Sequence, residues 1–211
     1  MNVQQFSIKQ LEVESKHLSD VLRCMLHTVL FNRAFGLVYP KEEIIDTLDF
    51  EYVRCDDVTV HQYVEEQIKT FRTTLAERED RRAQLVLSFF ETRSKKAWFR
   101  KVEEKICFEQ WVFFIILKED SPVETPEARE KLENELRERI MYIIQTVNEK
   151  QNHIPLKFQP TDLIPFPYEF IKTGSALHMQ LTDVITIPST SENWGVDMMW
   201  NLIKSPQPIL T

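Results

Sequence analysis

The chain has 211 residues, 43% of them hydrophobic and 28% charged, which is enough for one domain with a sizeable core. Its formal net charge of -7 argues against a nucleic-acid binder, which carries a basic footprint. It has only three glycines, which are widely separated, and this excludes the phosphate-cradling loops of nucleotide enzymes. The longest apolar run, 111–117, is far shorter than the ~20 residues that span a bilayer, so we expect a cytoplasmic protein without a transmembrane segment.

The first elements predicted are a strand and a helix. Apolar and polar residues alternate over 6–13, which indicates a short strand with an irregularity near Gln10. Apolar residues then recur at helical spacing over 18–30. Their stripe is broad and predicts a central helix, for which Gly36 is a natural stop.

A hairpin and a second helix follow. Residues 37–54 alternate as a hairpin does, with Asp49 and Glu51 on its polar face. Thr59 and Gln62 fit a capping box that opens the helix. The expected core face of this helix is a narrow stripe of Val60, Val64, Ile68, Phe71 and Leu75.

Two strong strands and a third helix come next. Residues 85–89 alternate, whereas about 108–117 is apolar on both faces, which is typical of a strand in the middle of a sheet. Their connector, 94–101, reads as an exposed, lysine-rich turn. Thr125 and Pro126 then start a helix that ends near Asn148. Its expected core face is Ala128, Leu132, Leu136, Ile140, Ile143 and Val147.

The last 60 or so residues differ in character. Prolines from Pro155 to Pro167 forbid a long helix there. Alternation returns over 177–181, and a short helix is expected at about 192–204. Because most strand neighbours are linked by hairpins, the order of elements favours an α+β fold with a largely antiparallel sheet.

We predict no catalytic residue, no metal site and no cofactor. None of the five histidines stands at ligand spacing, so a structural role is expected for each, including His27. The three cysteines are read as buried small side chains in a reducing compartment. Neighbouring carboxylates such as Glu42 and Glu43 are read as surface charges. An unrecognised enzyme stays as an alternative, because catalytic groups converge only in the fold.

One feature points to recognition instead of chemistry. Trp98 and Phe99 stand side by side among Lys95, Lys96, Arg100 and Lys101. On a loop tip both rings would reach solvent, and exposed aromatics with a basic rim are typical of an interaction hot spot. Two alternatives remain open here: one ring packs in the core, or the tip inserts into a membrane interface.

Several segments together resemble the autophagy-related protein 101 family. The matching segments appear in the family's order and span nearly the whole chain. They are Leu26-His27-Thr28-Val29-Leu30 with Arg33 and Gly36, Asp49-Phe50 with Tyr52-Val53-Arg54, Leu87-Ser88-Phe89-Phe90, the Trp98-Phe99 finger, Glu109-x-Trp111 and Leu202-Ile203-Lys204. The family's usual finger has a proline between its aromatics, whereas here they are adjacent.

The resemblance implies a single HORMA domain over 1–211, with three helices packed on an antiparallel sheet. Its core would span about 5–150 and a C-terminal safety belt about 155–211. It also implies a non-enzymatic adaptor that pairs with and stabilises the HORMA domain of autophagy-related protein 13. That adaptor would belong to the autophagy-initiating Ser/Thr kinase complex and be recruited to phagophore assembly sites.

The resemblance assigns roles to few residues. The finger, Trp98 and Phe99, would recruit downstream autophagy factors, and Phe31 and Asp46 are candidates for the heterodimer contact. The alternative is a peptide-capturing HORMA adaptor of another signalling pathway, whose belt wraps an extended partner segment.

Overall fold

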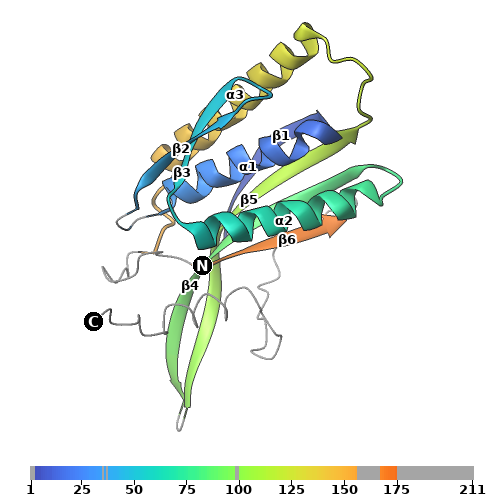
Figure 1. Cartoon of the computed structure of the whole chain (residues 1–211). Coiled ribbons are helices and arrows are strands. Elements are labelled where there is room, and N and C mark those ends of the chain that lie inside the picture. The colour runs from blue at the N-terminus through green and yellow to red at the C-terminus, as the bar shows by residue number, and fades with distance from the viewer. Residues whose placement is uncertain (1–2, 35, 37, 98–99, 156–166, 175–211) are drawn as a thin grey trace, which may run out of the picture.

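The computed structural model describes residues 3–34, 36, 38–97, 100–155 and 167–174, with side chains except at 94–97, 100–103 and 172–174. Figure 1 shows three helices on one face of a four-stranded sheet, and a two-stranded sheet against the first helix. This α+β arrangement confirms the predicted fold class and is consistent with a HORMA-like fold. The alternation at 177–181 and the expected helix at 192–204 lie outside the described residues.

The main sheet has the strand order β1-β5-β4-β6. β5 (Arg100–Lys118) lies between β1 (Gln4–Glu14) and β4 (Arg82–Ala97), and β6 (Tyr168–Gly174) pairs with the other edge of β4. The prediction of a central strand is therefore confirmed. β4 is antiparallel to both neighbours, whereas β1 runs parallel to β5. Two helices, a hairpin and β4 separate β1 from β5 along the chain and supply the long connection that parallel strands require.

The central helix is α1 (Ser15–Asn32), which lies between α2 (Val58–Ala76) and α3 (Pro126–Glu149) (Figure 1). Eleven of the eighteen α1 residues are buried, which confirms the broad stripe. The stripe predicted for α2 is confirmed in full, since its five members are the buried residues of that helix. On α3 the predicted face is buried from Leu136 onward, whereas Ala128 in the first turn is exposed.

The predicted hairpin is formed by β2 (Pro40–Ile45) and β3 (Phe50–Cys55), which pair antiparallel and pack against α1. Side chains of β3 such as Phe50 and Tyr52 enter the core. In the turn, Asp49 has a φ of 44°. This left-handed conformation is one that Asp and Asn adopt more readily than other residues with a side chain.

Two helix boundaries differ from the prediction. α1 ends at Asn32 instead of near Gly36, and the side chain of its C-cap residue, Arg33, turns inward to a buried carboxylate. α2 begins one residue earlier than expected, and its N-cap is Asp57 instead of Thr59. The Asp57 carboxylate accepts the backbone N–H groups of Thr59 and Val60 at 2.7 and 3.0 Å.

Two strand predictions also need correction. Within the connector expected at 94–101, residues 94–97 and 100–101 are paired backbone, since β4 and β5 continue to the pair Ala97↔Arg100. β6 is absent from the sequence prediction, because Pro165 and Pro167 just before it indicate irregular chain. It is nevertheless a strand, and it pairs with β4 from Ala83 to Phe89.

Candidate interaction surfaces

The β4–β5 hairpin leaves the body of the domain as a two-stranded arm (Figure 1). Pairing with β1 begins at Glu109 and pairing with β6 begins at Phe89. Beyond these points, in the part that the structure describes, the strand ladder joins only β4 and β5, although the Phe90 N–H still donates to the carbonyl oxygen of Pro167 at 2.9 Å. The register of these two strands continues to Ala97↔Arg100, so only two residues connect them. Those two are the predicted finger, Trp98 and Phe99, and they lie outside the described residues.

Cationic residues gather at the far end of this arm. The register places Lys96 opposite Lys101, Lys95 opposite Val102 and Ala97 opposite Arg100. The last three rungs thus hold four cationic residues and no carboxylate, in a chain whose net charge is -7. Nearer the body the charges are matched, as where Lys105 pairs with Glu169 of β6 at 2.8 Å. The backbone therefore supports the expectation of a basic rim beside the finger.

The two residues expected at a heterodimer contact are not brought together. Asp46 is exposed in the β2–β3 turn, where the next residue, Thr47, donates to Asp20 near the start of α1 at 3.4 Å. Phe31 is half-buried in the last turn of α1, eleven residues after Asp20. A rise of 1.5 Å per residue separates these two levels of the helix by about 16 Å.

The β2–β3 hairpin packs on α1 through β3 and turns its outer face to solvent. Along β2, Pro40, Glu42 and Ile44 are exposed, and Ile44 keeps 62% of its surface accessible. Tyr39, just before the strand, is 77% exposed. Exposed large apolar side chains on one short hairpin are typical of a protein-binding surface. The sequence pattern alone did not single out Tyr39 or Ile44.

Glu109 is the centre of a buried polar cluster. Its carboxylate accepts Arg33 Nε at 2.8 and 3.0 Å, is bonded to His153 Nε2 at 2.6 Å, and accepts the indole N–H of Trp111. Burial alone would raise the pKa of Glu109, but the hydrogen bonds from His153 and Arg33 outweigh it and lower that pKa. The Glu109 side chain is 0% exposed, and its bonds hold together β5, the end of α1 and the segment after α3.

The other nucleophilic or titratable groups of the interior are packed as well. All three cysteines are free, and burial raises the pKa of Cys55 and of Cys107 to about 11. They are therefore protonated and unreactive at neutral pH. His27 and His61 stack with their ring centroids 5.5 Å apart. Burial lowers the pKa of His27 to about 3, which agrees with the structural role predicted for it.

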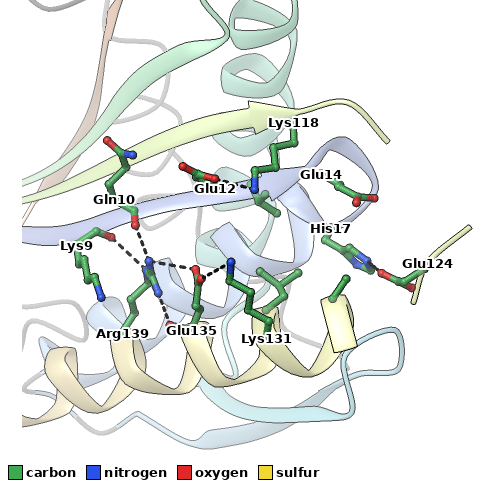
Figure 2. A pocket seen from close by; sticks show the side chains of 13 residues that line it. Lys9, Gln10, Glu12, Glu14, His17, Lys118, Glu124, Lys131, Glu135 and Arg139 are labelled. Atoms are coloured by element: carbon green, nitrogen blue, oxygen red, sulfur yellow. Dashed lines mark hydrogen bonds and ion pairs between the residues drawn. The ribbon is translucent and has the colours of Figure 1, made fainter. Parts of the chain in front are cut away.

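A surface cavity of about 390 Å³ lies between β1 and the first half of α3 (Figure 2). Several of its charged groups are paired with one another. Glu12 meets Lys118 at 2.7 Å, and Glu135 lies 3.5 Å from Arg139. Figure 2 shows Arg139 directed at the carbonyl oxygens of Lys9 and Gln10. The bonds of Arg139 thus join β1 to α3 along one wall of the cavity.

Two further observations concern only the part of the chain that the structure describes. There, no group of three or more His, Cys, Asp and Glu side chains is placed to hold a metal ion. No helix there is long and apolar enough to cross a membrane. The features that stand out in this part are thus the projecting arm and the exposed hairpin face.

Comparison with known proteins gives one consistent family. The family described as "Autophagy-related protein 101" matches residues 10–159. A protein of that name from Arabidopsis thaliana is 33% identical over 99% of this chain and 98% of its own length. The protein of that name from Schizosaccharomyces pombe is 23% identical over 88% of this chain and 88% of its own length. The one from Homo sapiens is 24% identical over 70% of this chain and 73% of its own length. The chain therefore belongs to the autophagy-related protein 101 family, and its role lies in autophagy.

Proposed function

We propose that this protein is a non-enzymatic adaptor of the autophagy-initiating Ser/Thr kinase complex. It binds the HORMA domain of autophagy-related protein 13 and stabilises it. It recruits downstream autophagy factors through the Trp98-Phe99 finger. It acts in the cytoplasm and at phagophore assembly sites. The proposal is carried by one observation: the β4–β5 ladder continues beyond both neighbouring strands to Ala97↔Arg100 and leaves two aromatic residues to connect its ends.

The finger is tested by Trp98→Ala combined with Phe99→Ala. We expect unchanged melting and unchanged heterodimerisation, with loss of recruitment of downstream factors in cells that lack the wild-type protein. The matched control is Val58→Ala with Val123→Ala, which removes two large apolar side chains that are 68% and 76% exposed elsewhere. If the finger variant instead precipitates or melts early, the two rings belong to the core and the recruiting role is wrong.

The heterodimer contact is assigned to the outer face of the β2–β3 hairpin, from Asp46 in its turn to the level of Phe31 at the end of α1. Size exclusion with light scattering, with and without the HORMA domain of autophagy-related protein 13, is expected to show a one-to-one complex. Ile44→Asp places a charge in the middle of this face and is expected to abolish the shift. Val123→Asp, at a site 76% exposed outside the hairpin, is the control. If the wild-type chain shows no shift, the HORMA domain of autophagy-related protein 13 is not its partner.

The second candidate is a peptide-capturing HORMA adaptor. It is favoured by β6, which ends the order β1-β5-β4-β6 and has no outer neighbour among the described strands. An extended partner segment can add to such an edge through main-chain hydrogen bonds. Limited proteolysis separates the two functions. Protection of the C-terminal region only when a partner peptide is present supports capture, whereas protection in the free protein supports the adaptor.

A further inference from the structure

The loop between β5 and α3, residues 119–125, interlocks with the junction of β1 and α1. The backbone N–H of Lys16, in the first turn of α1, donates to Asp120 Oδ1 at 3.1 Å. In return, the Glu14 carboxylate accepts the N–H and the hydroxyl of Ser121 at 3.2 and 2.8 Å. The first turn of a helix has N–H groups without an intrahelical partner. Since the N-cap side chain of Glu14 makes no cap bond, this loop supplies one from a distant part of the chain.

Ser121 is exposed and is followed directly by Pro122. None of the residues 119–125 is in a helix or a strand, so the chain on both sides of Ser121 is free of regular structure. The same loop holds a second dipeptide of this type, Thr125-Pro126, but its proline is already the first residue of α3. The Thr125 oxygen also accepts the N–H of Ala128 as the N-cap of that helix.

We propose that Ser121 is a phosphorylation site for a Ser/Thr kinase of the proline-directed class. Such kinases select a proline directly after the acceptor and bind the surrounding segment in an extended form. The Ser121 loop can adopt that form without unfolding, whereas Thr125 presents it only if the first turn of α3 unwinds. The Ser121 hydroxyl oxygen bonds to the γ-phosphorus of magnesium-ATP as the bond to the bridging oxygen breaks. ADP leaves, and the hydroxyl proton passes to the carboxylate base of the kinase.

The phosphate would break the contacts between Ser121 and Glu14. It removes the hydroxyl proton that Ser121 donates to Glu14 and puts a group of about two negative charges against that carboxylate. Asp120 and Glu124 add negative charge to the same loop. The nearest cation in these contacts, Lys16, is already shared between Glu14 at 2.9 Å and Glu124 at 3.3 Å. Repulsion therefore exceeds attraction, and modification loosens the start of α1 from the loop before α3.

The test uses the full, folded chain with magnesium-ATP and a purified proline-directed kinase, and maps phosphates by mass spectrometry. Mapping also distinguishes phosphate at Ser121 from phosphate at Ser205, which is followed by Pro206 and lies outside the described residues. Phosphate is expected at Ser121, and Pro122→Ala is expected to slow that labelling at least about tenfold. Thr125 is expected to be labelled in a peptide of residues 115–130 but much less in the folded chain.

Labelling of Ser121 in the peptide but not in the folded chain would overturn the proposal, as would equal labelling of the Pro122→Ala variant. The structural consequence has its own readout. The chain phosphorylated at Ser121 is expected to melt about 2–4 °C below the unmodified chain. Ser121→Ala, which loses the hydroxyl without gaining charge, is the control and is expected to shift less. If the phosphorylated chain melts at a higher temperature than the unmodified chain, phosphorylation does not loosen the contact between the loop and α1.

Discussion

Arg33 and Glu109 are 76 positions apart in the sequence and form an ion pair of 2.8 Å whose side chains are 1% and 0% exposed. Arg33 also donates to the carbonyl oxygen of Val147 at 3.1 Å. The pair therefore ties the end of α1 to the central strand and to the last turns of α3. Replacing one member of a buried pair leaves the other charged and unpaired, which is more costly than replacing both.

Glu109→Gln is accordingly expected to lower the free energy of unfolding by about 3–5 kcal/mol, measured by urea denaturation. The double variant Arg33→Met with Glu109→Leu is expected to lose less than Glu109→Gln alone. The control is Glu12→Gln, which breaks a pair whose two side chains are both 49% exposed and should lower the free energy of unfolding far less. Similar losses in the buried and exposed variants would contradict the role of the pair.

Arg139 is expected to stabilise the register shift in β1. The register of β1 against β5 shifts between Ile8 and Leu11, and Arg139 donates to the carbonyl oxygens of Lys9 and Gln10 inside that shift. Arg139→Met leaves those acceptors without their donor and should lower the free energy of unfolding by about 2–4 kcal/mol. Hydrogen exchange should quicken over β1 before it does elsewhere. Arg137→Met, an exposed position on the same helix, is the control.

Periodicity predicted the elements whose side chains alternate between core and solvent. Thus the stripe on α2 and the central place of β5 follow from the sequence, and so does the bulge near Gln10. β6 could not be found this way, because its partner β4 lies some 80 residues earlier and the strand exists through that pairing. The expected turn at 94–101 is paired for a related reason: a two-stranded ladder needs no apolar face, so its charged residues gave no strand signal.

The candidate sites divide in the same manner. Trp98-Phe99 is visible in the sequence because adjacent aromatics among lysines fit neither strand face. The cluster around Glu109 could be noticed only as separate family motifs, since Arg33, Trp111 and His153 converge through tertiary packing. The contacts of Ser121 with Glu14 were equally hidden, because the two residues are 107 positions apart in the sequence.

The cap of α2 allows a direct choice between the predicted and the observed residue. Asp57 accepts two first-turn N–H groups, and loss of such a cap typically costs about 1 kcal/mol. Asp57→Ala is therefore expected to lower the free energy of unfolding by that amount in urea. Thr59→Ala should change it by a few tenths at most, because Thr59 is already inside the helix. If Thr59→Ala instead lowered the free energy of unfolding more than Asp57→Ala, Thr59 would be the N-cap, as the sequence suggested.

Because of His27, the free energy of unfolding is expected to fall as the pH is lowered from 7 to 5. The pKa of His27 is held near 3 in the folded chain, mainly by burial and then by His61, against about 6.5 when unfolded. Between these values the unfolded chain binds the extra proton, so the free energy of unfolding falls with falling pH. The loss begins below about 6.5 and reaches at most about 1.4 kcal/mol per pH unit.

His27→Leu should remove most of this slope in urea denaturations at pH 7 and pH 5. The substitution introduces an apolar side chain of similar size. It discards His27 Nδ1, a buried nitrogen without a hydrogen-bond partner, together with the 3.3 Å bond between His27 Nε2 and His61. At pH 7 the variant should therefore be close to wild type. Carboxylates with lowered pKa, such as Glu109, lose their contribution only below about 4.5, so they do not contribute between these two pH values. An unchanged slope in His27→Leu would assign the effect to another group, of which His61, whose pKa burial also lowers, is the first to examine.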